Sequence, residues 1–496
     1  MVPSIRIQDC NQKPSRLDGD YVLYWMMANR RTRFNFALDR AIEIANDLQK
    51  PLLIVENLRS DYEWACDRFH RFVVDGMLDN QQDCETNGIS YLPFVESPKQ
   101  SLNGWIEKLA AKSAAVVTDD NPAFFYPALH RLMSRRIPVA LQAVDSVGLM
   151  PLRTTEKVYS RAHFYRKYVQ QTLPDHLVEF PAREPFDALE NKSKIDLSYL
   201  PNKYQPTALE TVDSLIEKLP IDHSVQPCAP GQAYAKGGSV QASRNLERFV
   251  QERIQSYSDK RNYPQEQATS FLSGHLHFGQ ISPHEIFDTI AKTEKWSPDH
   301  LAPAPTQKAL GWWGMSEDAE NYLDQLVVWR ELGFNMASKQ QNYRKFSSLP
   351  PWAQKTLQEH RHDVRQPCYT EQELDEAQTD DPLWNAAQNQ LRHEGLIHNY
   401  LRMLWGKKIL QWTESPEEAL RIMVHLNNKY AIDGRDPNSY SGIFWILGRY
   451  DRAWGPERQI FGKIRYMTSE NTARKFPVKQ YVEKYTADQQ KLPFAN

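Results

Sequence analysis

The sequence has little of what marks membrane and secreted proteins. The 496-residue chain holds no run of about 18 apolar residues, which argues against a membrane-spanning helix. Its first residues, Met1–Ile7, lack the apolar core of a secretion signal. The five cysteines are scattered and form no CxxC pair, so neither a disulfide framework nor a zinc knuckle is indicated. We therefore expect a cytoplasmic protein with no membrane partner.

Motifs of several enzyme classes are missing as well. No GxGxxG follows a predicted strand, and neither a GxSxG nor a P-loop occurs, so the sequence carries no nicotinamide fingerprint and no such hydrolase or nucleotide motif. His393 and His398 resemble part of a zinc-protease motif. They are five residues apart, however, and on a regular helix they would point about 140° away from each other. No metal site is predicted.

Length and charge set the broad class. At 496 residues the chain is expected to form two domains, and its 41% apolar and 25% charged content is typical of a soluble globular protein. The net charge of −2 alone argues against a nucleic-acid partner. From Arg392 to the end, however, 17 Lys and Arg residues stand against 11 Asp and Glu residues. Such an excess can form a phosphate-binding face, and it can equally be an ordinary solvated surface.

The first 150 residues alternate between short apolar runs and amphipathic segments. Strands are predicted at 21–25, 52–55, 89–92, 115–118 and 139–142, with helices at 36–48, 69–79 and 101–111. Buried strands that alternate with helices are typical of βαβ units. An α/β domain with a parallel, doubly wound sheet is therefore predicted for residues 1–150.

The rest of the chain is predicted to be helical after an irregular connection. Residues 151–240 are interrupted by prolines and hold a helical segment near 161–173, so we interpret them as an interdomain linker. From 241 to 496 strand signals are scarce. One helix start is well marked, because Ser415 suits the cap, Pro416 the first position, and Glu417 the first turn. An all-helical second domain is predicted.

Two groups of residues in the helical region could carry chemistry. Trp405 and Trp412 are seven residues apart, so they lie on one helix face about 10 Å apart along its axis. Trp384 lies 21 residues before Trp405, on the preceding helix. By spacing alone, such a stripe indicates core packing. The hydroxyls of Thr269-Ser-Phe-Leu-Ser273 could cap a helix or, with backbone N–H groups, hold a pyrophosphate.

The segments around these residues form a recognisable set. They are Asp381-Pro-Leu-Trp384, His398–Trp412, Asn427-Asn428, Asp433-Gly-Arg-Asp-Pro-Asn438, Asp451-Arg-Ala-Trp454 and Phe461–Met467. Together with Tyr21–Met26 and Val144–Pro151, they resemble the class II cyclobutane pyrimidine dimer photolyases of the photolyase/cryptochrome family. The resemblance covers most of the chain. It implies an FAD-binding helical domain and light-driven repair of cyclobutane pyrimidine dimers in UV-damaged DNA.

The resemblance also assigns roles around the cofactor. Trp405 would lie nearest the flavin in a three-tryptophan electron relay, with Trp384 in the middle and Trp412 at the surface end. The amide of Asn427 would face flavin N5, where it can accept or donate a hydrogen bond. The predicted FAD contacts are Tyr257, Arg261, Thr269, Ser270, Leu272, Ser273, Gln280, Asp433, Arg435, Asp436 and Asp451. Of these, Arg261 and Asp451 would form a charge pair beside the ring.

The lesion pocket and the DNA surface are assigned in the same way. Glu331 would hydrogen-bond the dimer and stabilise its radical anion, while Trp445 and Met403 would pack against the thymines. The predicted DNA contacts are Asn262, Arg449, Arg452 and Lys463.

Several positions near this pocket depart from the family pattern. Trp329 stands where an arginine is usual, Gly274-His275 where proline and an aromatic residue are usual, and Tyr450 where a histidine is usual. These departures favour the alternative function, a cryptochrome-like blue-light photoreceptor without repair activity. A second antenna chromophore in the α/β domain, a deazaflavin or a folate, is left open by the sequence. A monomer is expected.

Overall fold

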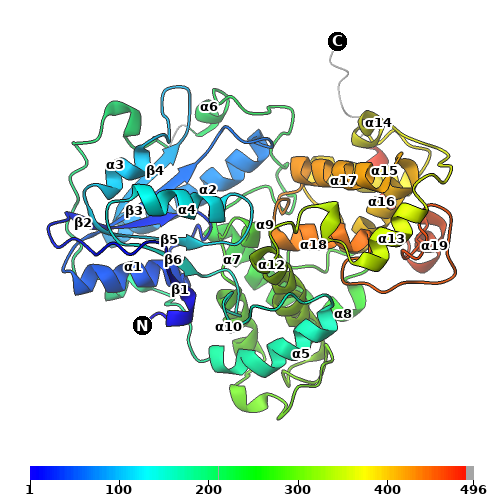
Figure 1. Ribbon diagram of the computed structural model, residues 1–496, viewed down its shortest axis with the longest axis horizontal. Coiled ribbons are helices and arrows are strands. Elements are labelled where there is room, and N and C mark those ends of the chain that lie inside the picture. The colour runs from blue at the N-terminus through cyan, green and yellow to red at the C-terminus, as the bar shows by residue number, and fades with distance from the viewer. Residues whose placement is uncertain (210–211, 488–496) are drawn as a thin grey trace.

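The computed structural model describes residues 1–209 and 212–487, and a six-stranded sheet organises the first part of the chain (Figure 1). The strands are β1 (Ile7–Asp9), β2 (Tyr21–Met26), β3 (Leu52–Leu58), β4 (Ser90–Val95), β5 (Ser113–Asp120) and β6 (Leu141–Asp145). Their order is β1-β6-β5-β2-β3-β4, and every pair is parallel except β1 with β6. The predicted parallel, doubly wound sheet is confirmed. The short edge strand β1 was not predicted, because three residues without buried side chains leave no apolar run.

Helices cover both faces of this sheet. Helix α1 (Phe36–Asp47) packs against β2, β5 and β6 on one face, and Asn35 caps its first turn by accepting the N–H of Ala37 at 3.0 Å. Helices α3 (Trp105–Ala110) and α4 (Tyr126–Arg136) contribute Trp105 and Met133 to the apolar cluster of the other face. The strand order reverses between β5 and β2, so the chain leaves their carboxyl ends in opposite directions and opens a crevice there.

The segment interpreted as a linker packs along both parts of the molecule. Helix α5 (Ala162–Thr172) is joined to the helical part by Arg166, whose guanidinium binds both carboxylate oxygens of Asp324 at 2.6 and 2.9 Å. Helix α6 (Val212–Ile216) packs instead on α2 (Asp67–Asn87). The proposed boundaries at residues 150 and 240 stay a prediction.

The remaining chain forms the predicted helical part, whose elements run from green to red in Figure 1. Its helices are α7 (Ser239–Arg248), α8 (Tyr257–Lys260), α9 (Ser273–His277), α10 (Pro283–Thr293), α11 (Glu317–Leu323), α12 (Arg330–Lys339), α13 (Pro351–Glu359), α14 (Glu371–Asp375), α15 (Pro382–Glu394), α16 (Asn399–Trp412), α17 (Pro416–Tyr430), α18 (Pro437–Ile446), α19 (Ser469–Lys475) and α20 (Lys479–Ala487). As predicted, Ser415 caps α17 by accepting the N–H of Glu418 at 3.2 Å.

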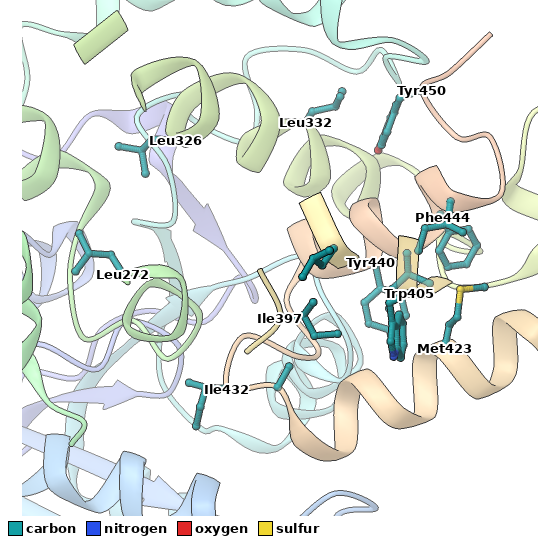
Figure 2. Packing of buried hydrophobic residues seen from close by; sticks show 14 of the residues in the cluster. Leu272, Leu326, Leu332, Ile397, Trp405, Met423, Ile432, Tyr440, Phe444 and Tyr450 are labelled. Atoms are coloured by element: carbon teal, nitrogen blue, oxygen red, sulfur yellow. The ribbon is translucent and has the colours of Figure 1, made fainter. Parts of the chain in front are cut away.

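One large apolar core holds these helices together. Figure 2 shows Trp405 within it, in the same cluster as Met423, Tyr440 and Phe444. Gly406 lets α16 approach its neighbours closely, because a Cβ there would lie 2.2 Å from a methyl of Ile446. Within the described residues, no helix has both the length and the apolar character needed to cross a membrane.

Candidate functional site

A cavity of about 940 Å³ lies in the helical part of the molecule. Its wall is formed by the segment 264–273, the junction of α15 and α16, the turn before α18, and parts of α18 and α20. Six predicted site residues line it, namely Thr269, Ser270, Leu272, Ser273, Asp433 and Trp445. The structure therefore brings together residues that are up to 176 positions apart in the chain.

One edge of this cavity combines hydroxyl groups with positive charge. Ser270 accepts a hydrogen bond from Tyr322 at 3.0 Å, and Ser273 shares one with Tyr234 at 2.7 Å. Arg248 and Arg253 line the same cavity, and burial, followed by the charge of Arg248, lowers the pKa of Arg253. Two cations beside these hydroxyls suit a diphosphate group.

Gly274 and His275, which depart from the family pattern, have a structural explanation. A Cβ on residue 274 would lie 2.3 Å from a methyl of Ile432, so only glycine fits against that neighbour. His275 is completely buried and its Nδ1 lies 2.9 Å from the side-chain oxygen of Gln280. The amide of Gln280 also donates to the carbonyl of Phe72 at 2.9 Å, and the residue lies off the cavity wall, so this position does not support its predicted flavin contact, which stays a prediction.

A different charge pair from the predicted one stands beside the middle of the cavity. Arg402 and Asp433 both line the wall and lie 3.4 Å apart. The predicted pair makes other contacts in this structure, since Arg261 lies over the ring of Tyr257 at 5.5 Å while Asp451 accepts the indole N–H of Trp454 at 3.1 Å, and its place beside the flavin stays a prediction. Tyr257 is buried and also lies off the wall.

Asn427 lies one layer behind the wall rather than on it. It is 1% exposed, donates to the Ser439 hydroxyl at 2.9 Å and accepts from Arg402 at 3.4 Å. Ser439 and Arg402 are the residues that face the cavity. The predicted contact of Asn427 with flavin stays a prediction, and in this structure the amide contacts Ser439 and Arg402.

Glu331 does not face the cavity either. Its carboxylate is buried against the turn after β6, where it accepts the N–H groups of Leu149 at 2.7 Å and Met150 at 3.1 Å. The reason is helical geometry. Trp329 lines the cavity. Glu331 comes two residues later, a rotation of about 200° around the helix axis, so its side chain lies on the opposite side of the helix. The predicted role of Glu331 at a lesion pocket is wrong, and the residue joins the helical part to the α/β part.

The pH dependence of stability should report this buried carboxyl. Burial raises the pKa of Glu331 from 4.5 to about 7, although Arg330 and the two N–H donors oppose the shift. The folded protein therefore holds this proton more tightly than the unfolded chain does. The resulting stabilisation is complete below pH 4.5 and is lost as the pH rises through 7, a change of about 3 kcal/mol. Denaturant unfolding from pH 4.5 to 7.5 should show that Glu331→Gln lacks this slope, and parallel curves would contradict the assignment.

The residues that do face the cavity on this side are Gln325 and Trp329. They are four positions apart in a π-helical segment, Asp324–Trp329, that joins α11 to α12. The Trp329 ring stacks on that of Trp445, with centroids 4.6 Å apart and planes 11° apart. Sequence reasoning treated Trp329 as a departure and missed Gln325. The signal was their spacing of four, which puts both on one helix face.

The three tryptophans of the predicted relay lie in direct succession. The Trp384 indole N–H donates to the carbonyl of Trp405 at 2.9 Å, and the Trp384 and Trp412 ring centroids are 5.5 Å apart. The predicted surface position of Trp412 is wrong, because it is 4% exposed. Tyr369, which is partly exposed, packs on its edge at 5.2 Å and covers it.

Comparison with known proteins identifies the family. No protein-family model matches the chain. The deoxyribodipyrimidine photo-lyase of Methanothermobacter thermautotrophicus is 33% identical over 486 residues, covering 98% of each chain. The Arabidopsis thaliana enzyme of the same name is 32% identical and covers 93% of this chain and 88% of that one. The chain belongs to the deoxyribodipyrimidine photo-lyase family. The family prediction is confirmed, while its class II assignment stays a prediction.

Solved structures agree with this photolyase fold. A class III photolyase from Agrobacterium tumefaciens superposes with a TM-score of 0.70 at 17% identity, covering 96% of this chain and 89% of that one. A Synechocystis cryptochrome gives a TM-score of 0.68 at 14% identity, covering 95% and 90%. At these identities, both structural similarities show a shared fold.

The predicted DNA contacts of this photolyase separate into exposed and buried residues. Arg452 and Lys463 are exposed on a hairpin-like turn closed by the bond from Trp454 N–H to the Lys463 carbonyl at 2.9 Å. Arg449 is 2% exposed and donates to the Tyr343 carbonyl at 2.6 Å, so its predicted phosphate contact is wrong. Asn262, the remaining predicted DNA contact, and Met403, which was predicted to pack against the thymines, are half-buried and lie off the cavity wall.

A second cavity of about 720 Å³ opens at the carboxyl ends of β2, β3, β4 and β5. Arg435 and Asp436 line it, although the sequence placed them at the flavin edge. The backbone turns at Arg435, which has a φ of 68°, so Asp433 faces the first cavity while Arg435 faces the second. The predicted flavin contacts of Arg435 and Asp436 stay a prediction, which their position at the second cavity does not support.

Replacing Trp384 should block the relay in this photolyase. Because Trp384 contacts both other tryptophans, Trp384→Phe is expected to remove most light-driven reduction of bound oxidised flavin. Absorbance during blue illumination measures it. Trp312→Phe, another buried tryptophan outside the relay, is the matched control for packing loss. Chemically reduced protein should repair equally well in all three forms, and a Trp384→Phe protein that photoreduces normally would contradict the relay.

Proposed function

We propose that this protein repairs cyclobutane pyrimidine dimers in DNA by a blue-light-driven electron transfer from reduced FAD. Family membership supports a DNA lyase that acts on dipyrimidine lesions. The observation that carries the proposal is one continuous cavity. It has hydroxyls and arginines at one edge, the Arg402–Asp433 pair in the middle, and the stacked Trp329 and Trp445 rings at another edge.

The cavity residues fit FAD. Thr269, Ser270 and Ser273 with Arg253 would hold the diphosphate, and the Arg402–Asp433 pair would lie beside the ring system. Asn427 keeps Arg402 and Ser439 in place from behind. Bound and photoexcited reduced FAD would supply the electron that opens the cyclobutane ring. The protein contributes position, charge and the exclusion of water.

The tryptophan edge fits a flipped-out dimer. A dimer is weakly stacked in the duplex, so extruding it costs less than extruding a normal base. Trp329 and Trp445 offer the flat apolar surface on which pyrimidines stack. Gln325 beside them provides an amide that can donate to a pyrimidine carbonyl or accept from a ring N–H. Arg452 and Lys463 would contact phosphates outside.

Repair of a defined oligonucleotide with one thymine cyclobutane dimer tests the function. Reduced protein under blue light should restore the thymines, while a dark sample should not. A parallel oligonucleotide with a (6–4) photoproduct tests the choice of lesion and should remain unrepaired. Bound, photoreducible flavin without any repair would overturn the enzyme proposal and favour the photoreceptor alternative.

The second cavity suits a further chromophore, a deazaflavin or a folate. It lies at the point where the strand order reverses, which is where open α/β sheets bind ligands. Trp64 and Trp105 line it, and their buried indole N–H groups lack hydrogen-bond partners among the described residues. Such donors match carbonyl groups on a planar ligand.

Binding of the two chromophores to the purified protein tests this assignment. Removing one donor with Trp105→Phe should weaken binding by roughly tenfold, the effect of one buried hydrogen bond. Trp313→Phe, which lines neither cavity, is the control. Equal binding by both variants, or no binding of either chromophore, would reject the site.

The location and assembly of the enzyme are part of the same proposal. All five cysteines are free, which supports a reducing compartment such as the cytoplasm. A single copy carries the whole cavity, which supports a monomer.

A further inference from the structure

The last described helix, α20, forms part of the wall of the large cavity. Gln480, Tyr481, Lys484 and Tyr485 of this helix line it. On α20 only the two tyrosines are buried, at 3% exposure each, among the residues whose burial is described. Most of the helix surface therefore faces solvent, in contrast to the buried helices α15 and α16 on which the cavity is built.

Polar bonds at the cavity edge attach α20 to α15. The Tyr481 hydroxyl donates to Gln390 at 2.8 Å, and the Tyr485 hydroxyl donates to Glu394 at 2.8 Å. Lys484 donates to the other carboxylate oxygen of Glu394, also at 2.8 Å. A helix of nine residues has little stability of its own in water, so its position depends on these contacts.

Gln390 links this attachment to the shape of the cavity. Its side-chain oxygen accepts the backbone N–H of His398 at 3.1 Å as well as the Tyr481 hydroxyl. His398 immediately precedes α16, and Asn399 and Arg402 in the first turn of α16 line the cavity. Displacement of α20 would therefore open the wall and also loosen the start of α16.

We infer that α20 is a lid of the flavin cavity. It closes over bound flavin and detaches when flavin enters or leaves. The inference rests on the proposed function, because it takes flavin as the occupant. An occupant that contacts the closed wall stabilises the docked helix, and the docked helix slows loss of the occupant by the same linkage. α20 thus combines cavity contact with little burial in the core.

Hydrogen exchange and the rate of flavin release test whether α20 acts as a lid. With the full chain, backbone exchange of residues 479–487 should be slower with FAD bound than without it. In the double variant Glu394→Gln with Tyr481→Phe, FAD fluorescence should report a dissociation rate raised by roughly tenfold, as expected for weakening two hydrogen bonds. Both substitutions keep the side-chain shape. Glu371→Gln, which removes the surface contact to Arg421 at 2.6 Å and lies off the cavity, should leave the rate unchanged.

Different results would contradict the lid and the proposed function. If FAD binds and supports photoreduction while the exchange of residues 479–487 is the same with and without FAD, the lid role of α20 is rejected and the proposed function is retained. An unchanged dissociation rate in the double variant also rejects the lid role. Absence of FAD binding to the wild-type chain rejects the proposed function and therefore the lid role as well.

Discussion

Glu331→Ala should lower the free energy of unfolding by about 3 kcal/mol and leave repair by the folded protein unchanged. The carboxyl group is 3% exposed and accepts the N–H groups of Leu149 and Met150. Alanine leaves both donors buried without partners, each at a cost of about 1–3 kcal/mol, and opens a small void at Gly148. Denaturant unfolding at pH 6 and dimer repair per folded molecule are the two measurements.

Two matched variants separate stability from lesion recognition. Glu320 is another buried carboxylate that accepts backbone N–H groups, from Gly314 at 2.8 Å and Met315 at 3.2 Å, but within the helical part. Glu320→Ala should cost a similar free energy. Gln325 faces the cavity, so Gln325→Ala should have the opposite effect. It should weaken dimer binding with little change in stability. Loss of repair in folded Glu331→Ala would restore the role that the sequence suggested.

The elements of the fold could be predicted because local signals agree with tertiary burial. Strands β2 and β5 are covered on both faces and so read as apolar runs, and the Ser415 cap marks the start of α17 unambiguously. The edge strand β1 lacks any such signal, since its side chains are exposed or half-buried.

Residues of the cavity wall were most readily predicted together where neighbours in sequence line one cavity. Thr269–Ser273 does so, because the segment runs along the wall. The turn 433–438 does not, since the positive φ of Arg435 divides its side chains between two cavities. The charge pair was missed because Arg402 and Asp433 come from different elements, 31 residues apart. Sequence order gives the residues of a turn but not the direction in which each points.

The π-helical segment before α12 determines which side chains can contact the dimer. It turns Gln325 and Trp329 toward the cavity and sends Glu331 to the α/β part. π-helical turns are uncommon and occur often at functional sites. The tryptophan edge of the cavity therefore presents an amide and two indoles, where the sequence had suggested a carboxylate. Dimer recognition in this protein should depend on stacking more than on charge.

Trp445→Ala is accordingly expected to weaken binding of dimer-containing DNA by roughly 5- to 150-fold, because stacking on an aromatic side chain contributes about 1–3 kcal/mol per base. Trp329→Ala should act similarly. The two effects should not add, since the rings stack on each other at 4.6 Å in the free protein and a dimer that enters between them must first separate them. Titration of fluorescent duplexes with and without one dimer measures each variant.

Trp454→Ala provides the contrast. Its ring lies 4.6 Å from the guanidinium of Arg452 and 5.3 Å from that of Arg465, outside the cavity wall. Its loss should disturb phosphate contacts, and so weaken damaged and undamaged duplexes to the same degree with a shallower salt dependence. If Trp445→Ala also lowers the affinities for damaged and undamaged duplexes equally, Trp445 is a general DNA contact and the dimer does not bind at the tryptophan edge. A loss confined to the damaged duplex places the dimer on these two rings.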